Sequence, residues 1–360
     1  MLGTVACTVA CTLACAVAAG LVAALLAPDR LGLTGRAPWV QLVALRGLVA
    51  VALVLAAAVL LAAVAGWARV AEKTGLRRPG RRLPLALAAL LVAGAGGQGA
   101  VLAGRGLDGD GPGAARADEL VVLSFNTFGT VTAGELAALV QEQDADVAVL
   151  PETSGRTARE AARLLTDAGR PTTALAADAV GRRADGVAVL LRDALGGYRT
   201  TTQGLPATDL GTFAAVATGR SAATEPGAGT AADRTPPAPG VVVAVHTRAP
   251  SSRGSMPQWR AHVPGVADIC RSTPGAVVAG DLNATLDHPG LADLGPCVDA
   301  AAVTGAAGLG TWPADLPRVL AAPIDHVLVD ARVWRVTGFG VLPRVGTSDH
   351  RPVVAHLVRH

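Results

Sequence analysis

The chain has 360 residues, of which 51% are hydrophobic and 16% charged, and its formal net charge is +3. A charge this small is too low to argue for a nucleic-acid-binding surface. The length predicts about two folding units. Most of the apolar excess lies before residue 105, and the rest has the composition of a soluble domain. We therefore expect a membrane part followed by one globular domain.

Three runs without a charged residue, 1–27, 47–67 and 83–104, predict three transmembrane helices. Each run exceeds the roughly 20 residues that a helix needs to cross the hydrocarbon layer of a bilayer. A buried helix of a soluble protein is a poor alternative for three such runs. A cleaved signal peptide is disfavoured because no Lys or Arg precedes the first run. Residues 1–104 are thus predicted to be a multi-pass anchor in the cell membrane.

The charges of the loops predict the orientation of this anchor. Segment 68–82 carries six Lys and Arg residues, whereas segment 28–46 carries three. Cytoplasmic loops are the ones enriched in Lys and Arg, so everything after the third run is expected outside the cytoplasm. Residues 105–118 are a Gly-rich linker. In an oxidising compartment Cys270 and Cys297 are candidates for a disulfide, although the sequence fixes no distance between them.

The globular part, residues 119–360, alternates short apolar runs with polar turns. Thr132 and Glu135 have the spacing of a capping box, which predicts a helix over 132–143. Many strands with few helices predict a four-layer α/β sandwich, in which two packed β-sheets carry outer helices. We expect strands near 120–125, 146–150, 186–191, 213–218, 241–246, 276–280, 326–329 and 352–357, and further helices near 156–168 and 257–271.

Polar side chains of catalytic types lie at the ends of these predicted strands, where a rigid scaffold usually presents functional groups. Phosphoester hydrolysis needs neutralised phosphoryl oxygens, an activated water and a protonated leaving oxygen. Mg²⁺ or Mn²⁺ prefers carboxylate and amide oxygens, and histidine transfers protons near neutral pH. No GxSxG elbow, P-loop, HExxH or zinc-type Cys/His cluster is present. The strand-end residues are Asn126, Glu152, His246, Asp281, Asn283, Asp325, Asp349 and His350.

The ordered motifs SFN, PET, VH, GDLN, PIDH and SDHRP resemble those of the endonuclease/exonuclease/phosphatase superfamily, which includes deoxyribonuclease I. The resemblance covers about residues 119–360. It implies a divalent cation, Mg²⁺ or Mn²⁺, with Glu152 as its principal carboxylate ligand. Asn126 beside Glu152 and Asp349 would complete the environment of the metal.

The same resemblance implies the catalytic roles. Asp281 would orient or deprotonate the attacking water, and Asn283 would donate a hydrogen bond to the phosphate. His350 would be the imidazole at the phosphate, oriented and kept protonated by Asp325. His246 matches the second histidine of the family, a general acid or a stabiliser of the transition state.

Substrate contacts are less defined by the sequence. Trp312, in the GTWP loop before Asp325, is a substrate-binding candidate that would stack on a base or pack on a lipid-like group. His326, the last residue of PIDH, is given no role by the motifs and is interpreted as structural or surface. The chain is thus predicted to be a membrane-anchored phosphodiesterase or phosphatase, with endonuclease activity as one interpretation.

The partners implied are the lipid bilayer and a phosphoester substrate, either nucleic acid or phospholipid, and no obligate protein partner is evident. The alternative function is a non-catalytic membrane-anchored binding module with the same fold. Loss of a motif carboxylate would favour that alternative, yet all the motif positions are filled.

Overall fold

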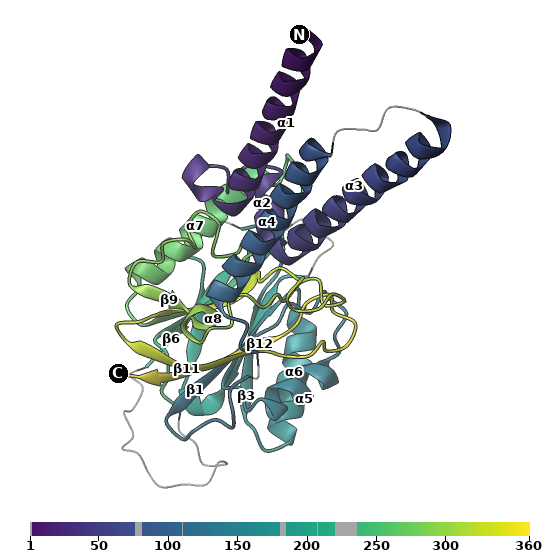
Figure 1. Cartoon of the computed structure of the whole chain (residues 1–360). Coiled ribbons are helices and arrows are strands. Elements are labelled where there is room, and N and C mark those ends of the chain that lie inside the picture. The colour runs from purple at the N-terminus through teal and green to yellow at the C-terminus, as the bar shows by residue number, and fades with distance from the viewer. Residues whose placement is uncertain (1, 76–80, 110, 181–184, 207, 220–235) are drawn as a thin grey trace. The chain divides into compact units, whose positions relative to one another are not determined.

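The structure is a computed structural model that describes the chain except residues 1, 76–80, 110, 181–184, 207 and 220–235, and except the side chains of residues 2–11 (Figure 1). The chain divides into two compact units, Met1–Gly104 and Arg105–His360.

The first unit is helical, and only part of its predicted membrane character is confirmed. By length and composition alone, α3 and α4 could cross a membrane, a test that buried helices and signal sequences also pass. The apolar part of α1 with described side chains, Thr12–Leu26, is shorter than a span, so three transmembrane helices are not confirmed. Within the predicted cytoplasmic loop, residues 76–80 lie outside the described residues. The helices are α1 (Leu2–Leu26), η1 (Asp29–Leu31), α2 (Trp39–Ala44), α3 (Arg46–Thr74) and α4 (Arg82–Arg105).

A buried polar contact connects three helices of this unit. The Nη1 atom of Arg46 donates to Oε1 of Gln98 over 2.6 Å, and Nε2 of Gln98 donates to the carbonyl of Leu25 over 2.9 Å. Arg46 is 3% exposed and Gln98 1%. At Gly97 an added Cβ would lie 2.4 Å from Cδ2 of Leu26. A glycine at this position therefore lets α4 approach α1 closely.

The second unit contains two six-stranded sheets. The first sheet has the order β11-β12-β1-β2-β4-β3 and the second β5-β6-β7-β8-β10-β9. Each sheet is mixed, with one parallel pair near its centre, β1 with β2 and β7 with β8. The strands are β1 (Glu119–Ser124), β2 (Val147–Pro151), β3 (Thr172–Ala177), β4 (Val187–Arg192), β5 (Tyr198–Thr201), β6 (Phe213–Ala217), β7 (Val241–His246), β8 (Ala276–Asp281), β9 (Cys297–Asp299), β10 (Asp325–Asp330), β11 (Trp334–Val341) and β12 (Val353–Arg359).

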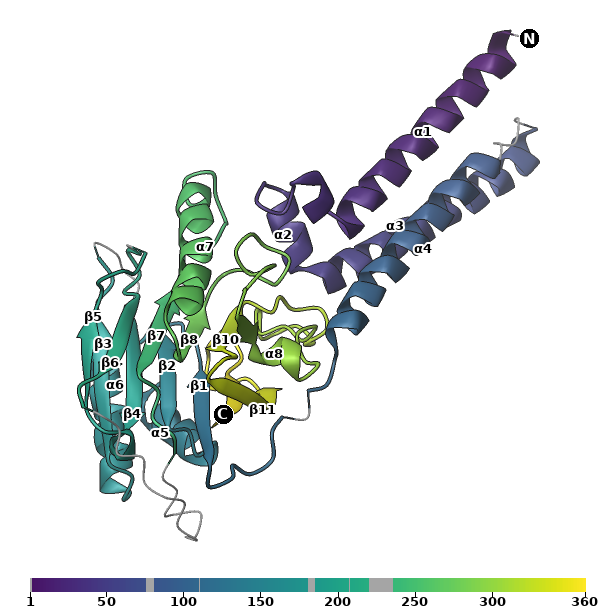
Figure 2. The ribbon, with the colours of Figure 1, turned by 90° about the vertical axis from the view of Figure 1, so that its left-hand side faces the viewer.

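The two sheets pack face to face, and helices cover their outer faces. Apolar residues of both sheets, among them Val149, Phe213 and Val277, form the core between them. Helices α5 (Ala133–Glu142) and α6 (Gly155–Asp167) lie on the outer face of the first sheet. Helix α7 (Met256–Ser272) packs against β8 and β10 of the second sheet, on the opposite side (Figure 2), and a short α8 (Ala300–Val303) contacts β9 and β10. The predicted α/β sandwich is present.

Local sequence explains several of these elements. Strands β1, β2, β8 and β10 are buried at every position, because sheet and helices cover both of their faces. The predicted capping box is formed, since the Thr132 hydroxyl accepts from the Glu135 backbone N–H and the Glu135 carboxylate accepts from the Thr132 backbone N–H. Cys270 of α7 and Cys297 of β9 form a disulfide with a Cα–Cα distance of 6.2 Å. Four strands that the apolar pattern does not predict, β3, β5, β9 and β11, are the four sheet edges.

Candidate active site

Three neighbouring strands of the second sheet place polar side chains in one row. His246, the last residue of β7, is the parallel partner of Asp281, the last residue of β8. Asp281 in turn is the antiparallel partner of Asp325, the first residue of β10. The ladder therefore brings together an imidazole and two carboxylates that are far apart in the sequence.

The first sheet contributes the opposing residues. Asn126 follows β1 and Glu152 follows its parallel neighbour β2, so both lie at the same edge of the sheet. His350 lies just before β12, the other neighbour of β1. The hydroxyl of Ser348 fixes this approach, because it donates to the Asn126 carbonyl over 2.7 Å and accepts from the His350 N–H over 3.0 Å. Ser348 precedes Asp349 in the SDH motif, and no role was predicted for it.

Asn126 bridges carboxylates that come from the two sheets. Its Nδ2 atom donates to Oε1 of Glu152 over 3.1 Å and to Oδ2 of Asp281 over 3.0 Å. Its Oδ1 atom accepts from the backbone N–H of Phe128 over 2.9 Å. Nε2 of His246 lies 3.7 Å from each of the same two carboxylates. The amide of Asn126 therefore orients the carboxylates of both Glu152 and Asp281.

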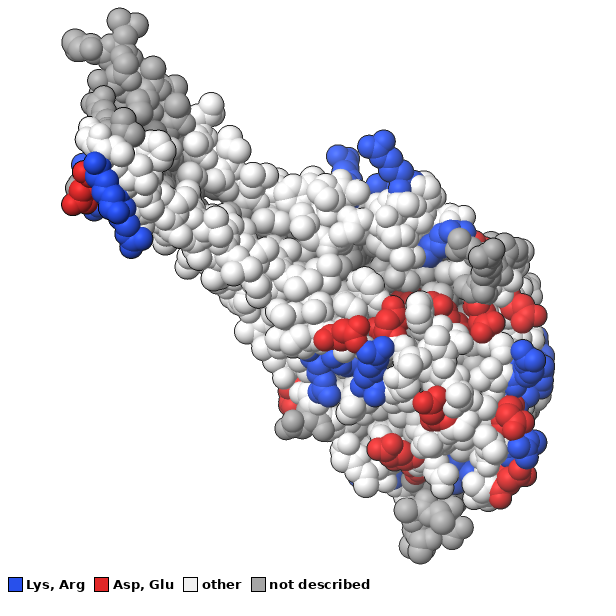
Figure 3. Space-filling view, turned by 90° about the vertical axis from the view of Figure 1, so that its right-hand side faces the viewer, with Lys and Arg blue, Asp and Glu red and all other residues white. Residues whose placement is uncertain are grey.

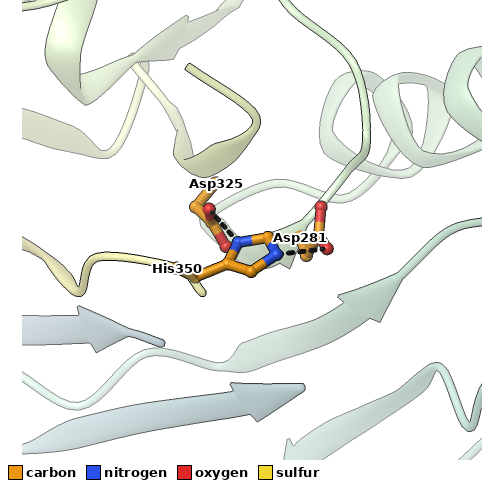
Figure 4. A group of neighbouring side chains, drawn as sticks. All are labelled: Asp281, Asp325 and His350. Atoms are coloured by element: carbon orange, nitrogen blue, oxygen red, sulfur yellow. Dashed lines mark hydrogen bonds and ion pairs between the residues drawn. The ribbon is translucent and has the colours of Figure 1, made fainter. Parts of the chain in front are cut away.

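His350 and Asp325 form a hydrogen-bonded pair directed at Asp281 (Figure 4). The Nδ1 atom of His350 lies 2.8 Å from Oδ2 of Asp325, and its Nε2 atom lies 3.8 Å from Oδ2 of Asp281. All three residues are at most 5% exposed. A carboxylate on Nδ1 fixes the orientation of the ring, and Nε2 is left facing Asp281.

The charged side chains of this group shift one another's pKa values. Burial raises the pKa of Asp281 to about 7, and the charge of Asp325 adds to the rise while that of His350 opposes it. Burial alone would lower the pKa of His350, but the charge and hydrogen bond of Asp325, helped by Asp281, raise it to about 10. The ring is therefore a cation at neutral pH. Burial also raises the pKa of Glu152.

Two backbone conformations at the site are strained. Glu152 has φ +53° and Asn283 has φ +46°, both in the left-handed region. Such residues persist where surrounding contacts hold them, often at functional sites. The side chain of Asn283, predicted to bind phosphate, donates to the carbonyl of Thr247 over 3.0 Å and to Oδ2 of Asp281 over 3.1 Å. The structure thus places Asn283 beside Asp281 and engages its amide with the protein.

Asp349 lies beside the imidazole of His350 and contacts Trp312. Its Oδ1 atom is 4.0 Å from Nε2 of His350, and its Oδ2 atom accepts from Nε1 of Trp312 over 2.9 Å. The Trp312 loop is joined to this segment by its backbone as well, since Ala314 donates to the Asp349 carbonyl over 2.7 Å. All the residues predicted for the site therefore gather at one end of the sandwich.

The donor set fits a hard divalent cation. Asp281, Asp325 and His350 are close enough to one another to hold a metal ion. The hydrogen bond between His350 and Asp325, however, already uses one atom from each of them. Oδ1 of Asp349, the ligand predicted with Glu152, is buried without a hydrogen-bond partner among the described residues, and so is Oδ1 of Asp325.

The sequence model of the Endonuclease/Exonuclease/phosphatase family matches residues 123–350, more than half of the chain. No curated protein matches the chain.

Several solved structures are similar to it. An endonuclease/exonuclease/phosphatase from Beutenbergia cavernae DSM 12333 is 18% identical, with 67% of this chain and 72% of that chain covered and a TM-score of 0.49. D. rerio TDP2 complexed with single strand DNA product is 16% identical, with 66% and 98% covered and a TM-score of 0.47. A mannosyl-6-phosphatase from Bacteroides thetaiotaomicron is 15% identical, with 66% and 99% covered and a TM-score of 0.45.

Proposed function

This chain belongs to the endonuclease/exonuclease/phosphatase family, and we propose that it is a membrane-anchored, divalent-metal-dependent hydrolase of phosphoesters. One observation carries the proposal. The buried ring of His350 is held by Asp325 on one nitrogen and faces Asp281 with the other, at 2.8 and 3.8 Å. A cationic imidazole beside a carboxylate of raised pKa supplies both a charge for the phosphate and a base for water.

The residues divide the reaction among them. Asp281 accepts the proton of the attacking water, because its raised pKa makes it a stronger base than an exposed carboxylate. His350, fixed by Asp325, hydrogen-bonds a phosphoryl oxygen and stabilises the charge that develops on it. His246, 3.7 Å from Asp281, is placed to stabilise or protonate the leaving oxygen.

A divalent cation, Mg²⁺ or Mn²⁺, would neutralise phosphoryl charge when bound. Glu152 and Asp349 are the residues that would hold it, supported by the partnerless Oδ1 atom of Asp349 among the described residues. We assign Asn126, the third ligand predicted from the sequence, the role of orienting Glu152, because its amide nitrogen faces that carboxylate.

The anchor and its orientation complete the proposal. Helices α3 and α4 would hold the chain in the membrane. The disulfide between Cys270 and Cys297 supports a catalytic unit outside the cytoplasm, where such bonds persist. A Ser251→Cys variant in intact cells should react with an impermeant maleimide above the level of the parent chain. Reaction only after permeabilisation would reverse the orientation.

The net charge of +3 and the arrangement of charges on one face favour a small or lipid-borne substrate over a long nucleic acid. On the face shown in Figure 3 acidic side chains form a row, and basic ones gather in separate groups. The described residues on that face therefore present no continuous basic track, such as nucleic-acid backbones require.

The test uses the full chain in detergent with Mg²⁺ or Mn²⁺ and four probes: bis(p-nitrophenyl) phosphate, single-stranded DNA, sphingomyelin and phosphoinositide. We expect metal-dependent turnover that EDTA abolishes and that Asp281→Asn lowers about 10²- to 10⁴-fold. Asp330→Asn, a buried carboxylate at the other end of β10, is the matched control and should retain turnover. A folded protein that neither binds metal nor turns over any probe would instead be a binding module.

A further inference from the structure

The turn after β8 follows directly on Asp281 and carries Asn283, another predicted site residue, and it is held from outside the site. The Asn283 N–H donates to Oδ1 of Asp281 over 2.8 Å, so the turn fixes the carboxylate. From α7, Nε1 of Trp259 donates to the Asn283 carbonyl over 2.9 Å. From β10, Nε2 of His326 lies 2.8 Å from the carbonyl of Ala284. The position of the turn therefore depends on side chains that do not reach the substrate.

His326 is itself fixed by a second buried contact. Its Nδ1 atom lies 2.7 Å from Oδ2 of Asp299, the last residue of β9. His326 is 4% exposed and Asp299 2%. The other oxygen of Asp299 accepts from the backbone N–H of Ala302 and so caps α8. Both ring nitrogens of His326 face acceptors, and a ring with a proton on each nitrogen satisfies both contacts.

The position of His326 in β10 explains how it acts on the site without entering it. Asp325 and His326 are consecutive in the strand, so their side chains point to opposite faces of the sheet. Asp325 holds the ring of His350, whereas His326 holds the turn whose Asn283 N–H binds the Asp281 carboxylate. One strand thereby sets the position of both halves of the catalytic group.

We propose that His326 is a positioning residue for phosphoester hydrolysis, which joins Asp299 to the Ala284 carbonyl and so holds the Asp281 carboxylate at the site. This inference rests on the proposed function. Its chemical basis is that a displacement of about 1 Å in a catalytic group can cost about 10²-fold in rate. Nothing in its contacts gives His326 a part in binding the substrate.

The kinetic test compares His326→Gln with wild type, using the full chain, Mg²⁺ and bis(p-nitrophenyl) phosphate. A glutamine amide can donate to only one of the two acceptors, so the turn is expected to shift. We expect kcat to fall about 10- to 100-fold with KM changed less than about twofold. His356→Gln is the matched control, because His356 is a buried histidine paired with Glu119 on the first sheet. It should lower stability and leave kcat unchanged.

Hydrogen–deuterium exchange gives a readout that does not depend on turnover. In His326→Gln, residues 281–288 should exchange faster than in wild type, whereas in His356→Gln they should not. Unchanged exchange, or unchanged kcat, would overturn the inference. An inactive wild type would contradict the proposed function only. The exchange comparison would still decide whether His326 holds the turn. Asp299→Asn, which keeps the shape of the side chain, should give the same changes at smaller size if His326→Gln does not fold.

Discussion

The indole Nε1 of Trp312 donates a hydrogen bond to Oδ2 of Asp349 over 2.9 Å. The bond occupies one oxygen of the carboxylate and leaves Oδ1, which is buried and has no hydrogen-bond partner among the described residues. Trp312 was predicted from its loop to contact substrate. Its contact with a predicted metal ligand adds an orienting role, of the kind that hydrogen bonds to ligands commonly play.

Trp312→Phe should weaken the affinity of the site for Mg²⁺ or Mn²⁺ about 10- to 100-fold, because an aromatic ring remains but the N–H that Asp349 accepts is lost. The measurement is a titration of activity against metal concentration, with calorimetry of Mn²⁺ binding. Trp334→Phe is the control, since the indole of Trp334 donates to the carbonyl of Gly275 instead. Equal metal affinities in both variants would leave Trp312 without this role.

Asp325→Asn should lower kcat about 10²- to 10⁴-fold, within the range expected when an imidazole loses its orienting carboxylate. The substitution preserves shape but removes the negative charge 2.8 Å from Nδ1 of His350. Steady-state kinetics on bis(p-nitrophenyl) phosphate would measure it, with circular dichroism confirming the fold. A folded variant with wild-type kcat would contradict the pairing.

Glu119 predicts a pH dependence of stability remote from the site. Burial alone would raise its pKa, but the N–H of Arg116, the hydroxyl of Thr337 and the charge of His356 together lower it. Because the pKa of Glu119 is lower in the folded state, ionised Glu119 stabilises the fold at pH values above its unfolded pKa of about 4.5. This stability is lost as the pH falls through the pKa of the folded state.

Glu119→Gln should therefore lower the free energy of unfolding by about 1–3 kcal/mol at pH 7, and by less as the pH falls below about 4.5. Urea unfolding of wild type and Glu119→Gln at several pH values would show whether the difference in their free energies of unfolding shrinks toward acid. If the difference in free energy of unfolding instead grew as the pH fell, the pKa of Glu119 would be raised rather than lowered in the folded state.

Removal of the disulfide with Cys270→Ser and Cys297→Ser should cost about 3–4 kcal/mol of stability, given the 27-residue separation of the two cysteines. Denaturant unfolding would measure the loss. Cys15→Ser, at a free cysteine of α1, should leave the free energy of unfolding of the catalytic unit unchanged. A similar loss in that control would assign the effect to the substitution rather than to the bond.

The central strands were predictable because burial on both faces leaves a continuous apolar run, as in Val241–Val245 and Ala276–Ala279. The edge strands were not. Strand β5, Tyr198–Thr201, has no fully buried residue, and β11 contains Gly338 and Gly340 among its apolar positions. An edge strand forms by pairing with a single neighbouring strand, and a local sequence pattern does not reveal that pairing.

The candidate residues were found because each lies at a strand end, as with Asn126 and Glu152. Their pairing needed the three-dimensional arrangement, since Asn126 meets Asp281 across 155 positions of sequence and from the other sheet. His326 gave no signal, because its importance comes from Asp299 and Ala284, contacts that no motif encodes.

The contact among Leu25, Arg46 and Gln98 has a consequence for the order in which the chain is made. Gln98 follows Leu25 by 73 residues and Arg46 by 52, and it takes part in both of the shorter bonds. A nascent chain cannot form these bonds until α4, its third long helix, has been synthesised. Because residue 105 opens the second unit, all three segments that form this contact are synthesised before that unit is.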